Sequence, residues 1–134
     1  MDAALAQAVS DFCLANPSLA TASGSFSKCG AVSLKLKSFL EKRGYEAEVL
    51  RLAECSRQYP GADRRWRKLG GEFWWVHYAV RVEDVVVDCA ARQFDSECEH
   101  PLIRSLQDVT AEWGEAYGVD PVTGARNGPR APAP

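Results

Sequence analysis

The sequence predicts an α+β fold in which helices pack on a small antiparallel β-sheet. Apolar residues recur at helical spacing near both ends of the chain and again after Cys29. Between residues 45 and 89, in contrast, three segments have the alternation and β-branched composition of strands. Only Glu83 and Asp84 separate the last two of these segments, which suits a two-residue hairpin turn. The hairpin in turn predicts antiparallel pairing.

The composition indicates one globular domain. The chain has 134 residues, of which 46% are hydrophobic and 25% charged, and its formal net charge is −2. A chain of this size can bury enough apolar surface to fold without disulfide bonds or a metal. The slight excess of acidic over basic residues argues against a general nucleic-acid binder. No apolar run approaches the ~20 residues of a membrane span. We therefore expect neither a nucleic-acid partner nor a membrane association.

The expected compartment follows from the N-terminus and the cysteines. Residues 1–11 lack the basic and apolar regions of a secretory signal peptide, which predicts a cytoplasmic protein or an effector delivered without a Sec signal. The cysteines are odd in number and irregularly spaced, unlike the framework of a secreted disulfide-rich domain. They are Cys13, Cys29, Cys55, Cys89 and Cys98. We expect them to be reduced thiols.

Two helices are predicted in the first third of the chain. Residues 2–15 carry an apolar stripe that ends at Asn16-Pro17, since the residue before proline disfavours the α conformation. An ordered loop rich in small and hydroxyl residues is expected over residues 18–28. A second helix begins at Cys29 and ends at Arg43-Gly44. Its apolar stripe consists of Val32, Leu36, Phe39 and Leu40.

The remaining elements are three strands and a final helix. Strands are expected over residues 45–53, 72–82 and 85–89, and a long loop over residues 54–71. A helix is predicted over residues 101–117, with His100 at its start and an apolar face formed by Leu102, Leu106, Val109 and Trp113. We place the domain at residues 1–118 and expect a disordered tail over residues 119–134, which are rich in Pro, Gly, Ala and Arg.

Cys29 is the cysteine placed for thiol chemistry. Unpaired backbone N–H groups and the helix dipole favour a thiolate at the start of a helix. Gly30 and Ala31 keep the first turn small, so that backbone or substrate can approach closely. Cys13, on the apolar stripe of the first helix, has the context of an inert buried thiol.

His77 is the best candidate for the base that such a thiol needs, and Asp88 for its partner. His77 lies in an otherwise apolar and aromatic strand, where a polar ring requires a hydrogen-bond partner or a catalytic role. If Val82 pairs with Val85 across the turn, Ala79 lies opposite Asp88, and His77 and Asp88 become diagonal neighbours on one face of the hairpin. A carboxylate that orients an imidazole, which activates a thiol, is a Cys-His-Asp triad.

These residues resemble the papain-like and transglutaminase-like cysteine enzymes. The resemblance rests on Lys28-Cys29-Gly30-Ala31-Val32-Ser33 at a helix start, on His77 in a following strand, and on Asp88 followed by Gln93-Phe94. The last of these motifs is similar to small bacterial members, including deamidating toxins and effectors. The resemblance covers residues 23–94, about half of the chain, and implies a papain-like core with additional helices at both ends.

The resemblance implies a cysteine hydrolase or acyl transferase without a cofactor or metal. It would be a protease, a deamidase or a transglutaminase-like enzyme that acts on amide bonds of a protein or peptide substrate. No glutamine stands shortly before Cys29, so we expect the oxyanion hole to use the Cys29 backbone N–H and another amide of residues 23–28. Four further residues are expected to support the oxyanion or line the substrate cleft: Ser27, Lys28, Trp75 and Gln93.

Three alternative interpretations remain open at the level of sequence. His77 could be a satisfied core histidine and Cys29 a small buried hydrophobe. The chain could also be a noncatalytic binding module on the same scaffold, recruiting an acidic protein partner through the basic segment from Arg57 to Lys68. Zinc binding is the third, with Cys55, Cys89, Cys98 and His100 as its ligands, although their spacing matches no common zinc motif.

Overall fold

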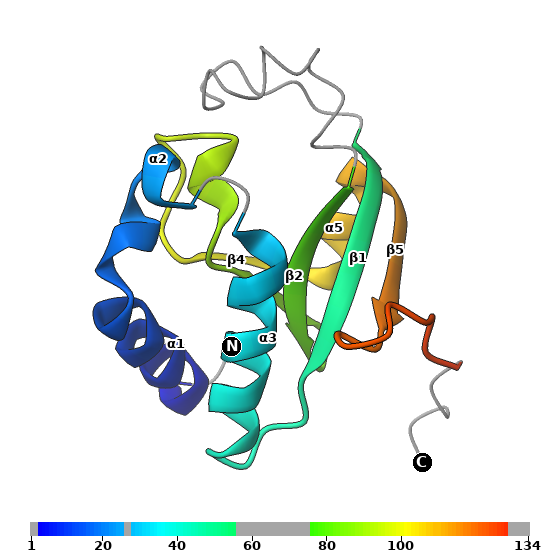
Figure 1. Cartoon of the computed structure of the whole chain (residues 1–134), viewed down its shortest axis with the longest axis horizontal. Coiled ribbons are helices and arrows are strands. Elements are labelled where there is room, and N and C mark those ends of the chain that lie inside the picture. The colour runs from blue at the N-terminus through cyan, green and yellow to red at the C-terminus, as the bar shows by residue number, and fades with distance from the viewer. Residues whose placement is uncertain (1–2, 26–27, 56–75, 129–134) are drawn as a thin grey trace.

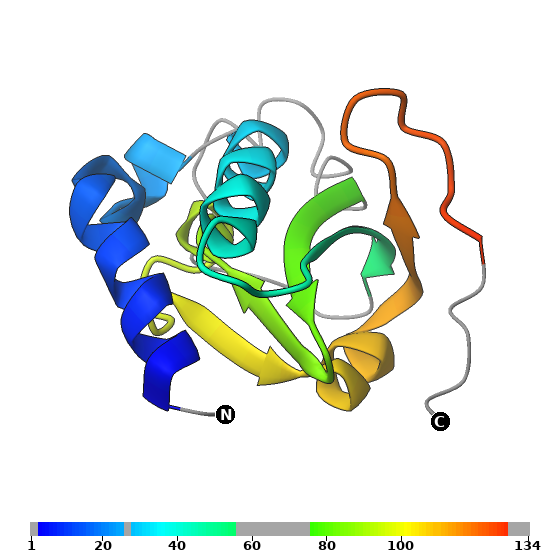
Figure 2. The same cartoon turned by 90° about the horizontal axis from the view of Figure 1, so that it is seen from below.

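The protein is a mixed α+β structure built around one antiparallel sheet (Figure 1). The computed structural model describes residues 3–25, 28–55 and 76–128. Within these residues, helices α1 (Ala3–Ala15) and α3 (Cys29–Glu41) lie on one side of the sheet, and α5 (Leu106–Glu112) lies on the other. Figure 2 shows the sheet between these two layers.

The described part of the sheet has the strand order β4-β3-β2-β1-β5, and all of its neighbours are antiparallel. The strands are β1 (Glu48–Cys55), β2 (Val76–Val82), β3 (Val85–Asp88), β4 (Leu102–Ser105) and β5 (Trp113–Val119). Strands β1 and β2 pair over most of their length, and β5 pairs with the free side of β1. The last strand in sequence is therefore next to the first.

Two apolar clusters, one on each face of the sheet, hold the layers together. Val80 and Val87 belong to the cluster beneath α1 and α3, whereas Leu52, Ala79 and Val86 belong to the cluster that α5 covers. Alternate residues of one strand thus contribute to opposite clusters, as the period of two along a β-strand requires. His77 is two residues before Ala79 and therefore belongs to the α5 face.

The predicted hairpin is confirmed in its pairing. Val82 pairs with Val85 and Val80 with Val87. Glu83 adopts the positive φ of 53° that a tight two-residue turn demands. The two helices predicted for the first third of the chain are confirmed as α1 and α3.

Helix α3 ends in a glycine cap. Gly44 has a φ of +91°, in the left-handed region. The Tyr45 N–H donates to the Leu40 carbonyl at 3.1 Å and the Gly44 N–H to the Glu41 carbonyl at 3.0 Å. Carbonyl groups of the last turn that lack an intrahelical partner are satisfied in this way.

The expected loop over residues 18–28 is instead partly helical. Pro17–Ala20 forms the 3₁₀ helix η1, and Ala22–Ser25 forms the short helix α2. Leu19 is buried and anchors this segment to the core beneath α1. Proline at the start of η1 has the fixed φ that a first helical turn needs.

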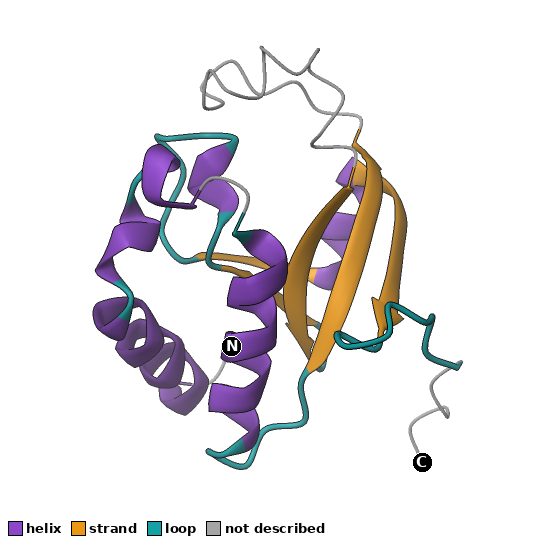
Figure 3. Cartoon of the chain, viewed as in Figure 1, coloured by secondary structure: helices purple, strands orange, loops and turns teal. Residues whose placement is uncertain are grey.

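The predicted C-terminal helix is wrong over most of its length. The structure has β4, α5 and β5 where the apolar spacing suggested one helix from residue 101 to 117, and His100 precedes a strand rather than a helix (Figure 3). Ser105 is the N-cap of α5, and its side chain accepts from the Asp108 N–H at 3.1 Å. Pairing of β4 with β3 and of β5 with β1 outweighs helical propensity on either side.

The expected disordered tail is also corrected as far as Gly128. Val119 ends β5, and Asp120 Oδ1 accepts from the N–H groups of Val122 and Thr123 at 2.8 and 3.0 Å, which forms a turn. The chain then returns along β5, where Val119 bridges Arg126. Residues 129–134 lie outside the described residues.

Several predictions fall on parts of the chain that are not described. They are the basic segment from Arg57 to Lys68, the start of the strand predicted from residue 72, and the residues Ser27 and Trp75. None of the helices in the described ranges has the length and apolar character needed to cross a membrane.

Candidate active site

Cys29 is the first residue of α3. Lys28 is exposed, stands at the N-cap and makes no side-chain capping bond, and the first hydrogen bond of the helix runs from the Val32 N–H to the Lys28 carbonyl at 2.8 Å. The N–H groups of Cys29, Gly30 and Ala31 precede that bond. They give the helix start its positive electrostatic character, which favours a thiolate and any developing oxyanion nearby.

His77 lies near the start of β2 and is almost fully buried, with 1% of its surface exposed. Trp113 stacks on the imidazole at 5.8 Å between ring centroids, and Phe94 contacts it edge-on at 4.8 Å. Both aromatic residues are buried as well. The orientation of the imidazole is therefore restricted from two sides.

Asp88, the last residue of β3, binds the imidazole directly. Its Oδ2 is 2.6 Å from His77 Nε2, and its Oδ1 accepts from the Ala90 N–H at 3.0 Å. Both carboxylate oxygens are thus engaged, which fixes the carboxylate. The other ring nitrogen of His77, Nδ1, is buried and has no aligned hydrogen-bond partner among the described residues. It is the nitrogen that remains for Cys29.

The start of α3 lies near the His77 imidazole, at the end of β2 where β2 and β3 no longer pair. The β2–β3 pairing runs from Val82–Val85 to Val80–Val87, beyond which β2 continues against β1 and β3 continues against β4. Helix α3 packs mainly on β2, and a side chain at Gly30 would lie 3.9 Å from the Tyr78 ring. Cys29 is consequently beside β2, although most of α3 covers the opposite face of the sheet from His77.

The three side chains are coupled electrostatically. Burial alone would raise the pKa of the Cys29 thiol, and the charge of Asp88 acts in the same direction. The positive charge of the nearby His77, together with the Tyr78 N–H, outweighs both and lowers that pKa below its usual value. Burial likewise disfavours the protonated form of His77. The negative charges of Asp88 and Cys29 outweigh burial and raise the pKa of His77 well above its ordinary value. The site therefore favours a thiolate–imidazolium pair.

Gln93 is fully buried in the 3₁₀ helix η3 (Ala91–Gln93), just after Asp88. Its neighbour Arg92 donates through Nη1 to the Ala20 carbonyl at 2.7 Å and through Nε to the Cys98 carbonyl at 3.0 Å. Arg92 thereby joins the segment before Cys29 to the segment after Asp88. A contact of Gln93 with the reacting groups stays a prediction.

Sequence reasoning did not identify the ring neighbours of His77 as such. Phe94 belongs to the Gln93-Phe94 motif, and an aromatic residue so soon after Asp88 is a signal for packing near the site. The apolar spacing predicts a helix at Trp113, but this residue begins β5. Its position beside His77 depends on the pairing of β5 with β1. Ser25, which lies shortly before Cys29, is buried, and its Oγ donates to the Thr21 carbonyl at 2.8 Å.

A cavity of about 290 Å³ lies behind the imidazole rather than in front of the thiol. Asp88, Phe94 and Trp113 line both the cavity and the surroundings of His77, but neither His77 nor Cys29 lines the cavity. Its remaining wall comes from β1, β3, β4, α5 and the segment between β3 and β4, and it includes Asp95 and Arg104 as well as apolar side chains. This cavity is therefore not one into which the Cys29 thiol opens.

No metal centre is assembled in the ranges that the structure describes, where no three His, Cys, Asp or Glu side chains are grouped as ligands. Comparisons with protein-family models, with curated proteins and with solved structures give no match for this chain. The assignment of the site consequently depends on its geometry and chemistry.

Proposed function

We propose that the protein is a thiol-dependent amide hydrolase or acyl transferase that uses Cys29, His77 and Asp88. The observation that carries the proposal is the 2.6 Å contact between Asp88 Oδ2 and His77 Nε2. It leaves Nδ1 of the same imidazole for a cysteine at the start of a helix. His77 also lowers the pKa of the neighbouring Cys29 thiol, which a purely structural role for this histidine does not require.

The mechanism follows from the roles of the three groups. The Cys29 thiolate attacks the carbonyl carbon of an amide, and the His77 imidazolium transfers its Nδ1 proton to the leaving nitrogen. The neutral imidazole then accepts a proton from water or from another acceptor nucleophile, which attacks the thioester and releases Cys29. Asp88 holds the imidazole in the orientation that presents Nδ1 and stabilises its protonated form.

The start of α3 supplies the electrophilic part of the site. The backbone N–H of Cys29 is one donor for the oxyanion that forms during the attack, and the dipole of α3 adds to it. The residue order supports a papain-like core: cysteine at a helix start, histidine on a strand, and aspartate on the neighbouring strand. The substrate class we propose is the amide bond of protein glutamine side chains or of peptides.

Site-resolved alkylation tests this proposal. The five cysteines fall in five different tryptic peptides, so that iodoacetamide labelling of each can be followed separately by mass spectrometry. From about pH 5 to about pH 9, Cys29 should react fastest and retain its advantage below the reference thiol pKa of about 8.5. His77→Ala should abolish this advantage, whereas His100→Ala, which changes the other histidine, should preserve it.

Two further results complete the test. Cys29→Ala should remove the fast-labelled peptide and any amide hydrolysis or deamidation of a glutamine peptide library. An ordinary reaction rate for Cys29 in the folded wild-type protein, unchanged by His77→Ala, contradicts the proposal. Binding to an acidic partner through the segment from Arg57 to Lys68 would then be the function to examine.

A further inference from the structure

A second pair of thiols meets away from the triad. Cys13 lies in α1 and Cys89 directly follows Asp88, 76 residues later, yet their Sγ atoms are 3.8 Å apart. Both are free thiols. A disulfide requires about 2.05 Å between the sulfurs, so small movements of the two side chains would suffice.

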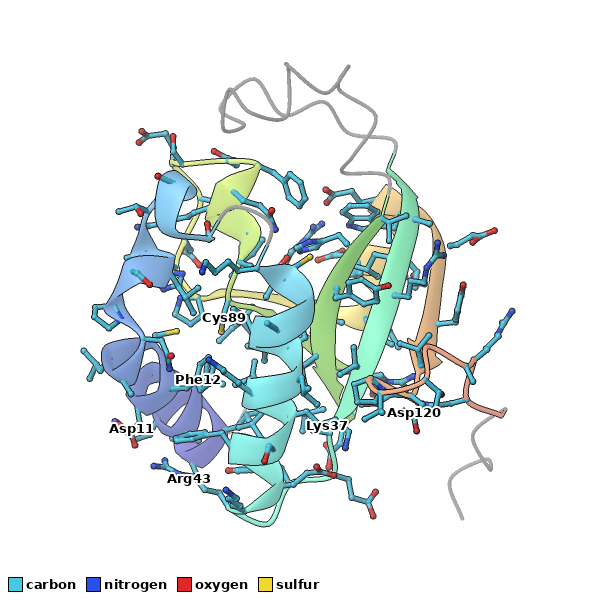
Figure 4. All side chains as sticks on the ribbon, viewed as in Figure 1. Asp11, Phe12, Lys37, Arg43, Cys89 and Asp120 are labelled. Atoms are coloured by element: carbon cyan, nitrogen blue, oxygen red, sulfur yellow. The ribbon has the colours of Figure 1, made fainter. Side chains whose placement is uncertain are left out.

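The apolar layer beneath α1 and α3 holds these two thiols together. Cys89 is 2% exposed and belongs to this layer with Phe12, while Cys13 packs against it. In Figure 4, Cys89 and Phe12 lie on the α1 side of α3. The Asp11–Arg43 ion pair, at 2.8 Å, and the edge-on contact of Phe12 with Phe39 tie α1 to α3. The approach of the sulfurs is thus built into the packing of α1.

The two sulfurs differ in access and in acidity. Cys13 is partly exposed, so a small oxidant can reach it, whereas Cys89 is buried. The contact with Cys89 lowers the pKa of Cys13. The same contact, together with burial and the nearby negative charge of Asp88, raises the pKa of Cys89. Because Cys13 is the accessible member of the pair, it is the thiol that the oxidant reaches first, and the buried Cys89 in contact with it resolves the intermediate.

We propose that Cys13 and Cys89 are a modification site at which hydrogen peroxide forms a reversible disulfide. The Cys13 thiolate attacks one peroxide oxygen, the O–O bond breaks, and a sulfenic acid and hydroxide result. Cys89 then loses its proton and attacks the Cys13 sulfur, and the sulfenic hydroxyl leaves as water. Two thiols and one hydrogen peroxide give one disulfide and two water molecules. A dithiol reductant reverses the oxidation.

The disulfide has a defined structural consequence. It joins α1 to the residue next to Asp88 and closes a loop of more than 70 residues of the chain. Such a cross-link restricts the unfolded chain and stabilises the folded one, as long as native geometry accommodates it. The oxidised protein should therefore unfold at a higher urea concentration than the reduced protein.

The test uses the full-length Cys29→Ala protein, which removes the proposed catalytic thiol and makes the result independent of the proposed function. The folded protein is treated with one equivalent of hydrogen peroxide, alkylated, and digested with trypsin without reduction. We expect the peptides that carry Cys13 and Cys89 to be recovered mainly as one cross-linked species, two hydrogen atoms lighter than their sum. Dithiothreitol should separate them again.

Matched variants make the result decisive. Cys13→Ser should lose both the cross-linked species and the increase in urea midpoint, whereas Cys98→Ser should retain both. Recovery of Cys13 and Cys89 as separately alkylated peptides after peroxide treatment would overturn the proposal. A cross-link between either of them and Cys55 or Cys98 as the main product would overturn it equally.

Discussion

The carboxylate of Asp88 influences the protonation state of the other two residues of the proposed triad. It contacts His77 through Oδ2 and is fixed by the Ala90 N–H through Oδ1. Its charge is the main influence that keeps the buried imidazole protonated, and the imidazolium in turn lowers the pKa of Cys29. Removing this negative charge should act on the thiol in two opposing ways: directly, by lowering the pKa of Cys29, and through the His77 ring, by raising it. The contribution of His77 is the larger.

Asp88→Asn tests this relay. The amide retains the shape of the carboxylate but lacks its charge, so burial lowers the pKa of His77 and the thiolate loses its cationic partner. We expect Cys29 labelling by iodoacetamide at pH 7 to slow by about tenfold for each unit by which its pKa rises, and the pH profile to move to higher pH. Asp84→Asn, on the exposed turn of the same hairpin, should leave the profile unchanged. Equal rates for the wild type and Asp88→Asn would contradict the relay.

The sequence predicts these residues because their placement depends on local features. A two-residue turn fixes the β2–β3 register, and that register alone puts His77 and Asp88 on one face. The apolar stripe after Cys29 likewise defines the start of α3. The position of Trp113, in contrast, depends on a contact between β5 and β1, which are separated by more than 50 residues, and no local pattern encodes it.

At the scale of elements, the end of α3 shows how one residue supports a helix. Gly44 is in the left-handed region with a φ of +91°, and the turn that it makes satisfies carbonyl groups of the last helical turn. A Cβ atom added at Gly44 would meet no atom within 4 Å. A substitution there would therefore change stability through the backbone conformation and not through a steric clash.

Gly44→Ala should therefore destabilise the protein by about 1 kcal/mol, the usual cost of a left-handed conformation for a residue with a side chain. The urea dependence of tryptophan fluorescence measures this change. Gly128→Ala, also with open space around the added methyl group but without a positive φ, is the matched control and should have no effect. A Gly44→Ala protein as stable as the control would contradict the cap.

The C-terminal region marks the limit of prediction from periodicity. Leu106 and Val109 are correctly placed on a helix, since Ser105 caps α5 there. Leu102 and Trp113 continue the apolar spacing of that helix on either side, yet they belong to the strands β4 and β5. Their partners β3 and β1 are distant in sequence, so the competition between helix and strand is decided by tertiary hydrogen bonding.

For the whole molecule, the raised pKa of His77 makes stability depend on pH. The unfolded imidazole loses its proton near 6.5, whereas the folded one keeps it to higher pH because Asp88 is beside it. Between these two values the folded state binds more protons than the unfolded state. The contribution of His77 to the free energy of unfolding is therefore fully present below about pH 6.5 and is lost as the pH rises towards the folded pKa.

This prediction is best measured in the Cys29→Ala background, where the thiolate no longer contributes. The free energy of unfolding, from urea titrations at a series of pH values between about 6 and about 8, should fall by up to about 1.4 kcal/mol per pH unit. Adding His77→Gln should remove this slope while other titrating groups stay the same. Parallel pH profiles for the two proteins would show that the pKa of His77 is the same in the folded and unfolded states, which contradicts this prediction.

The two hydrogen bonds of Arg92 also bear on how the protein opens. One guanidinium holds the Ala20 carbonyl ahead of Cys29 and the Cys98 carbonyl behind Asp88. Neither segment can detach without breaking a bond that orders the other, so local unfolding should release both as one cooperative unit. Amide hydrogens on the two flanks would then exchange with solvent at a common rate, and a species with Cys29 in place but Asp88 displaced would not accumulate.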